Sequence, residues 1–159
     1  EIINSVLEVN DDQKIKLVEK VKNYFGDLKG MRLALWGLAF KPDTDDIREA
    51  SALYMIDQLT AAGAEVIAFD PEAKENVQAT VGDKIEYAEN QYECLDGADA
   101  LLIATEWSMF CNPDFDKMKA LLKQPIIFDG RNIYEVDRMK GMGFYYNSMG
   151  RATVTAFEK

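Results

Sequence analysis

The sequence contains no histidine, and this absence excludes several kinds of site at once. Without imidazole there is no Ser-His or Cys-His relay, and the commonest zinc ligand and general base near neutral pH are missing. Cysteine is scarce as well. Cys94 and Cys111 form no CxxC pair and have no cation beside them, so we expect two reduced, unreactive thiols rather than a disulfide, a nucleophile or a metal site.

The sequence also has no long hydrophobic run and relatively few positively charged residues. No apolar run approaches the roughly 20 residues that cross a bilayer, and there is no secretion signal, so we expect a cytoplasmic protein without a membrane partner. Eighteen basic residues face 28 acidic ones, for a formal net charge of −10. Such a chain repels nucleic acid. It can bind a small anion only where a few cations and backbone N–H groups converge locally.

What the sequence does have begins with an amphipathic helix over residues 1–26. Its apolar positions recur with a period near 3.5, and Asn10 and Lys14 fall on the same seam, as polar residues that fix the register of a helix pair do. The helix either packs on its own domain or pairs with a second helix in a dimer. Because the chain starts with Glu1 inside this helical pattern, we expect a piece of a longer polypeptide.

Beyond Gly30 the pattern changes to short β-rich runs that alternate with helical stretches. This alternation predicts parallel β-α-β units, and hence an α/β domain over residues 30–150 with a Rossmann-like, doubly wound, mostly parallel sheet of about six strands. Residues 151–159 read as a loose tail. The expected strands are 32–38, 64–70, 84–88, 100–105, 125–129 and 144–148, and the expected helices are 51–62, 114–122 and 134–140.

The exits of the expected strands carry the candidate binding residues. Gly37 ends the first strand, but the second and third glycines of the dinucleotide fingerprint are missing, so the usual NAD site is degraded. Lys41 and Arg48 follow before the next helix, and Arg131 follows a later strand. In a parallel sheet all three cations share one edge, where they suit a diphosphate. The alternative for the first two is a solvated loop whose charges pair with each other.

Three further side chains near these exits are open to two interpretations. Asp70 ends the second strand, where a Rossmann carboxylate meets a ribose, but the Pro71 that follows favours a simple turn former. Trp107 and Phe110 are interpreted as core residues rather than as platforms for a ligand.

Five motifs follow one another along the chain: GLAFKPDTDDIRE (37–49), FDP (69–71), ADA (98–100), TEW (105–107) and FDGRN (128–132). Together they closely resemble the carboxyl-terminal, UDP-binding domain of UDP-glucose 6-dehydrogenases, within the nucleotide-sugar dehydrogenase family. The resemblance implies that Phe40, Lys41 and Arg131 contact the UDP-sugar and that Arg48 faces the NAD phosphates. It also implies that residues 1–26 end a central linker and dimerisation helix.

The resemblance further implies what this chain lacks. Enzymes of the family oxidise UDP-glucose to UDP-glucuronate with two NAD molecules and a cysteine nucleophile, and their amino-terminal half binds most of the NAD. Neither the cysteine segment nor the glycine fingerprint occurs here, so we expect the chain to bind UDP or UDP-glucose and to be inactive alone. Alternatives are a related GDP-mannose or UDP-N-acetylmannosamine dehydrogenase, a stand-alone nucleotide-sensing module, and a pure dimerisation domain.

Overall fold

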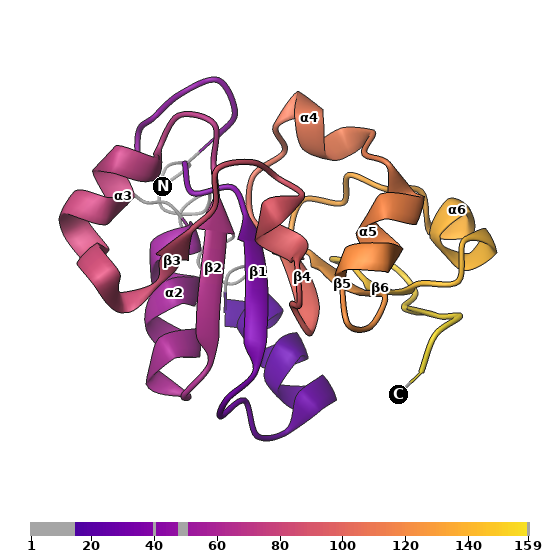
Figure 1. The fold of residues 1–159 in the computed structure, drawn as a ribbon. Coiled ribbons are helices and arrows are strands. Elements are labelled where there is room, and N and C mark those ends of the chain that lie inside the picture. Colours follow the sequence, from indigo (N-terminus) through magenta and orange to yellow (C-terminus); the bar gives the residue numbers. More distant parts are fainter. Residues whose placement is uncertain (1–14, 40, 48–50, 159) are drawn as a thin grey trace, which may run out of the picture.

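A seven-stranded sheet forms the centre of the molecule (Figure 1). The structure, a computed structural model, describes residues 15–39, 41–47 and 51–158. The strand order is β3-β2-β1-β4-β5-β6-β7; only β7 is antiparallel to its neighbour. The strands are β1 (Arg32–Trp36), β2 (Glu65–Phe69), β3 (Glu86–Tyr87), β4 (Ala100–Ile103), β5 (Ile126–Asp129), β6 (Tyr145–Asn147) and β7 (Val154–Thr155). The mostly parallel α/β fold is therefore confirmed, with one strand more than expected.

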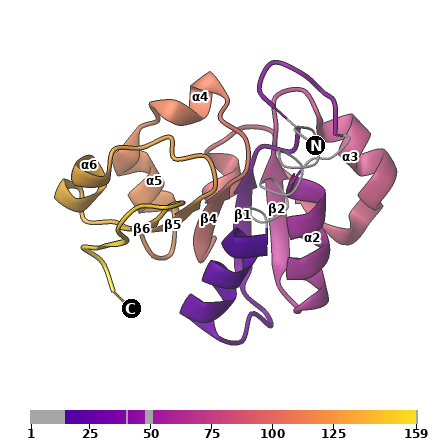
Figure 2. The same ribbon diagram turned by 180° about the vertical axis from the view of Figure 1, so that it is seen from behind.

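Helices cover both faces of this sheet, as Figures 1 and 2 show from opposite sides. One face packs against a helix over residues 15–25, α2 (Ser51–Ala61) and α3 (Lys74–Val81). The other packs against α5 (Phe115–Leu121), α6 (Val136–Gly141) and the short turns η2 (Glu93–Leu95) and α4 (Ser108–Cys111). One further turn, η1 (Gly82–Lys84), precedes β3.

Alternation along the strands divides the core between the two faces. In β1, Leu33 and Leu35 belong to the first core cluster, whereas Ala34 and Trp36 belong to the second. All four residues of β4 are buried, as the continuous apolar run in the sequence predicts for a strand covered on both sides.

The strand order places a topological switch point between β1 and β4. From β1 the chain builds β2 and β3 on one side, and then returns to add β4, β5 and β6 on the other. The loops that leave β1 and β4 therefore diverge at the edge where the parallel strands end, hereafter the carboxyl edge. Open α/β sheets bind their ligands at this position.

The structure tests what the sequence predicts for the two ends of the chain. Within the described residues, the first helix packs on its own sheet through Leu17, Val18 and Val21, as one of the two alternatives required; Asn10 and Lys14 lie outside the described residues. The expected loose tail over 151–159 is wrong for Val154–Thr155, which pair with β6. Two residues with one buried side chain leave too little pattern to be recognised as a strand.

Candidate functional site

The loop that leaves β1 is held tightly by the strands on either side of it. Gly37 has φ +97° and donates its N–H to the carbonyl of Phe69 at 2.9 Å. The N–H groups of Leu38 and Ala39 both donate to Asp70 Oδ2, at 2.7 and 3.1 Å. From the β4 side, the buried Thr105 hydroxyl donates to the Ala39 carbonyl at 2.8 Å. The first loop therefore leaves the sheet on a fixed path.

Asp70 organises this edge with both of its carboxyl oxygens. Oδ1 accepts the N–H groups of Glu72 and Ala73, each at 2.8 Å, and Oδ2 also accepts Trp107 Nε1 at 3.2 Å. The side chain is only 4% exposed. Asp70 is thus the turn former that the Asp-Pro sequence favours, and its hydrogen bonds are made to the protein rather than offered to a ribose.

Asp70 also occupies the backbone N–H groups of the first loop, the cradle that a dinucleotide would use. In a Rossmann nucleotide site, backbone N–H groups of the first loop point at the pyrophosphate. Here the N–H groups of Leu38 and Ala39 point at a carboxyl group of the protein itself. These two N–H groups are therefore not available to an external anion, whereas Lys41, farther along the loop, is exposed.

Arg131 leaves the same edge from β5. Its N–H donates to Asp129 Oδ1 at 2.8 Å, and Asp129 is fully buried. Its guanidinium contacts Glu106 Oε2 through both Nε and Nη2, each at 2.6 Å. Glu106 therefore orients Arg131 by occupying one side of its fork. Within the described residues, Arg131 Nη1 has no protein acceptor and remains available to a ligand.

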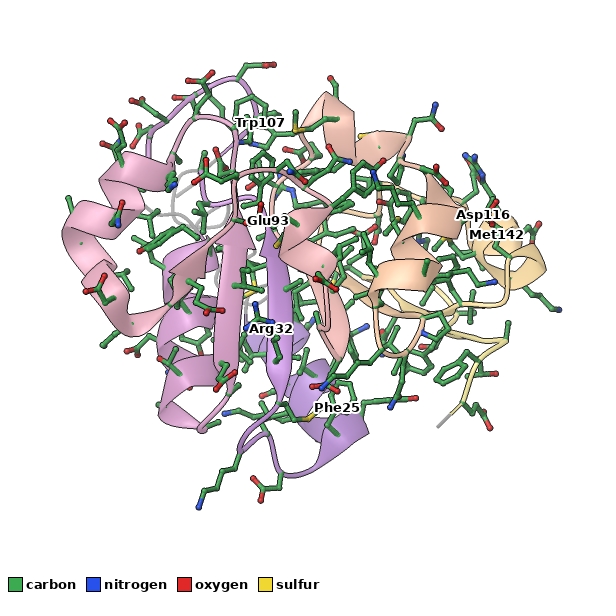
Figure 3. The ribbon with its side chains drawn as sticks, viewed as in Figure 1. Phe25, Arg32, Glu93, Trp107, Asp116 and Met142 are labelled. Atoms are coloured by element: carbon green, nitrogen blue, oxygen red, sulfur yellow. The ribbon has the colours of Figure 1, made fainter. Side chains whose placement is uncertain are left out.

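The structure brings these loops together because β1, β4 and β5 are neighbours that run in parallel. Gly130 N donates to the Ile103 carbonyl at 2.9 Å, which ties the β5 exit to the β4 exit. In Figure 3, Trp107 lies beyond the carboxyl ends of the strands, whereas Arg32, at the start of β1, lies toward the opposite edge. Lys41 and Arg131 thus extend from loops on one edge. Phe40 and Arg48 lie outside the described residues.

A hollow of about 600 Å³ lies at the carboxyl ends of β2 and β3, next to these loops. Its single lysine, Lys74, pairs with Glu89 at 3.2 Å, and the carboxyl groups of four further residues surround it. Such a lining repels phosphate. The acidic lining consists of Asp45, Asp70, Glu72, Glu75 and Glu89.

The cysteines and aromatics behave as structural residues. Cys94 is buried, and burial raises the pKa of its thiol to about 12. Cys111 is exposed, yet partial burial together with Asp129 and Glu106 raises its pKa too, so neither thiol has the lowered pKa of a nucleophile. Phe110 is buried and stacks on Trp36, with ring centroids 4.7 Å apart. The burial of Phe110 agrees with its interpretation as a core residue.

Alkaline unfolding tests the environment of Cys94. The folded chain holds the thiol proton up to about pH 12, whereas the unfolded chain releases it above about pH 9. This contribution to the free energy of unfolding is complete below pH 9 and should fall by about 1.4 kcal/mol per pH unit above it. Urea unfolding at pH 8 and 10.5 should show a smaller loss in Cys94→Ala than in the unaltered chain; equal losses would contradict the assignment.

Several residues that shape the site were not among the predicted ones. Asp129 and Glu106 contact Arg131 directly. Tyr146 donates its hydroxyl to Asp129, and Arg151 donates to the hydroxyl of Tyr146. Asp129 and Glu106 stand in the FDGRN and TEW motifs, so their positions at strand exits were visible. Their pairing was not, because it depends on which strands are neighbours in the sheet.

Comparison with known proteins decides the family. A family model described as "UDP-glucose/GDP-mannose dehydrogenase family, UDP binding domain" matches residues 34–136, which include most of β1, all of β4 and β5, and the loops of the carboxyl edge. The chain belongs to this family. Over 157 residues it is 40% identical to the UDP-glucose 6-dehydrogenase TuaD of Bacillus subtilis (strain 168), covering 99% of this chain and 34% of that protein.

Solved structures agree with this family domain. A UDP-glucose dehydrogenase from Pyrobaculum islandicum superimposes with a TM-score of 0.72 at 32% identity, over 82% of this chain and 28% of that one. The UDP-N-acetyl-mannosamine dehydrogenase Cap5O from Staphylococcus aureus gives 0.64 at 25% identity, over 91% and 32%. The chain therefore spans about a third of the length of these relatives. None of the helices in its described part is long and apolar enough to cross a bilayer.

Proposed function

We propose that the chain binds UDP, or the UDP part of a UDP-sugar, at the carboxyl edge of its sheet. One observation carries the proposal: Lys41 and Arg131 leave the sheet from loops on the same edge, outside a backbone cradle that Asp70 already fills. The acidic hollow beside them disfavours an anion. Two local cations thus act against a net charge of −10.

The roles of the individual side chains follow from their chemistry. Arg131 presents the Nη1 side of a fork whose opposite side is held by Glu106, and this geometry suits a phosphate oxygen. Lys41 adds a compact, solvent-exposed charge. The family resemblance assigns two more residues: Phe40, directly before Lys41 in the sequence, to the UDP-sugar, and Arg48 to the NAD phosphates.

For the protein that contains this domain, we propose NAD-dependent oxidation of UDP-glucose to UDP-glucuronate. NAD binds mainly to the other half of that protein, residues 1–26 contribute to a homodimer, and the enzyme works in the cytoplasm. The 40% identity to a UDP-glucose 6-dehydrogenase, against 25% to a UDP-N-acetyl-mannosamine dehydrogenase, supports glucose as the sugar. The chain alone carries no catalytic residue and is inactive.

A titration with UDP tests the binding site. UDP should shift the amide NMR signals of the loop over residues 37–47 and of residues 129–132. Lys41→Ala should weaken binding by about tenfold, as expected for the loss of one charge-assisted phosphate contact. The matched control is Lys84→Ala, which removes another exposed lysine, just before β3 at the opposite edge. Shifts confined to other loops, or equal effects of the two substitutions, would reject the site.

A further inference from the structure

The segment that follows β6 lies directly against the loop that carries Arg131. Asn132 and Met149 exchange two hydrogen bonds: Asn132 Nδ2 donates to the Met149 carbonyl at 2.9 Å, and Met149 N donates to Asn132 Oδ1 at 2.8 Å. Asn132 has φ +56°, a left-handed conformation that this exchange stabilises. The β5 loop, residues 129–134, is therefore held from outside by the chain beyond β6.

Arg151 makes the most extensive contacts of this segment. Its guanidinium donates to Ser148 Oγ through Nε at 3.0 Å, to the Tyr134 carbonyl through Nη1 at 3.0 Å, and to the Tyr146 hydroxyl through Nη2 at 2.8 Å. Its Cζ also lies 5.5 Å from the centre of the Tyr146 ring. All three edges of the planar fork are thus used.

Tyr146 connects Arg151 to the loop that carries Arg131. Its hydroxyl donates to Asp129 Oδ2 at 2.5 Å, while the other oxygen of Asp129 holds the N–H of Arg131. Tyr146 is fully buried; burial, together with the nearby Asp129, raises the pKa of its hydroxyl, so the donor proton is retained at neutral pH. A continuous chain of hydrogen bonds therefore links Arg151 to the backbone of Arg131.

We propose that Arg151 is a positioning residue of the nucleotide site, which fixes the backbone from which Arg131 reaches the phosphate. This inference rests on the proposed function. Arg131 contacts Glu106 and a phosphate at the same time only if its backbone is correctly placed, and Asp129 sets that placement. Arg151 orients Asp129 through Tyr146 and closes the β5 loop through Tyr134. A lysine has no planar fork, and so cannot reproduce all three contacts.

A double-mutant cycle on the 159-residue chain tests the proposal. Arg151→Ala should raise the dissociation constant for UDP by about tenfold, with a smaller rise for Arg151→Lys. In an Arg131→Ala background, Arg151→Ala should add almost nothing, because its effect passes through Arg131. The matched control is Arg138→Ala, which removes another arginine stacked on an aromatic ring, at 4.7 Å from Phe115, and should leave UDP binding unchanged.

A second readout needs no ligand. In the Arg151→Ala variant, the backbone amide and Nε–H NMR signals of Arg131 should shift. In the Arg138→Ala control, the same Arg131 signals should stay in place. Unchanged Arg131 signals, an unchanged dissociation constant, or full additivity with Arg131→Ala would each overturn the proposal; Arg151→Lys answers the same questions if the alanine variant fails to fold. If the unaltered chain does not bind UDP, the proposed function is wrong. The Arg131 signals then still show whether Arg151 holds the β5 loop.

Discussion

Replacing Asp70 with alanine should destabilise the domain by about 4 kcal/mol or more. The substitution leaves five donors without their acceptor: the N–H groups of Leu38, Ala39, Glu72 and Ala73, and the indole N–H of Trp107. An unsatisfied buried donor costs about 1–3 kcal/mol, and water that enters the gap recovers only part of this. Since domains of this size are stable by only about 5–15 kcal/mol, the loss should be plain in urea unfolding.

Two further variants make this measurement specific. Asp70→Asn keeps the shape and one acceptor oxygen, so it should lose less than the alanine variant. Asp57→Ala removes an exposed aspartate from the middle of α2 and should change the free energy of unfolding by less than about 0.5 kcal/mol. Equal unfolding midpoints for Asp70→Ala and Asp57→Ala would show that Asp70 does not hold the edge together.

The hydrogen bonds of Asp70 also bear on where a nucleotide can bind. The carboxyl group of Asp70 accepts two N–H groups of the β1 loop, which in a dinucleotide site would face a pyrophosphate, so these donors are already satisfied by the protein. The absence of the second and third fingerprint glycines is consistent with this arrangement, because no ligand needs to approach the backbone there. Under the proposed function, a nucleotide at this edge would therefore be held by side chains such as Lys41 and Arg131.

The framework of the fold could be predicted because its signals are local. The apolar run of β4 and the alternation of strands with helices both depend on neighbouring residues, and the parallel sheet follows from them. The same reasoning missed α3, which buries only Val77, and the single turn α4. Short elements of this kind depend on tertiary packing rather than on a pattern of their own.

The candidate site could be predicted only in outline. Parallel strands place the exits of β1 and β5 on one edge, and so Lys41 and Arg131 were assigned to the same edge from sequence. The pairing of Glu106 with Arg131 and the chain from Arg151 to Asp129 join side chains that are 25 and 22 residues apart. Such contacts depend on rotamers and on the path of the chain after β6, and neither leaves a periodic signal in the sequence.

Gly37→Ala should produce the second large loss, about 3 kcal/mol or more, at the start of the same loop. At φ +97° a side chain already strains the backbone by about 1–2 kcal/mol. The added Cβ would also lie 2.5 Å from Thr105 Cβ and 2.7 Å from Thr105 N. Since one of these neighbours is backbone of the adjacent strand exit, a rotamer change cannot relieve the contact, and overpacking adds about 1–3 kcal/mol.

Gly26→Ala separates the two causes. Gly26 has a similar positive φ of +78° and ends the first helix, but a Cβ there would meet nothing within 4 Å. Its substitution should therefore cost only the backbone term, about 1–2 kcal/mol. Thermal or urea unfolding of both variants compares their stabilities directly. Equal losses in the free energy of unfolding would mean that the contact with Thr105 adds nothing to the backbone strain. A larger loss for Gly37→Ala shows that the missing side chain at Gly37 allows the β1 loop to pack closely against Thr105.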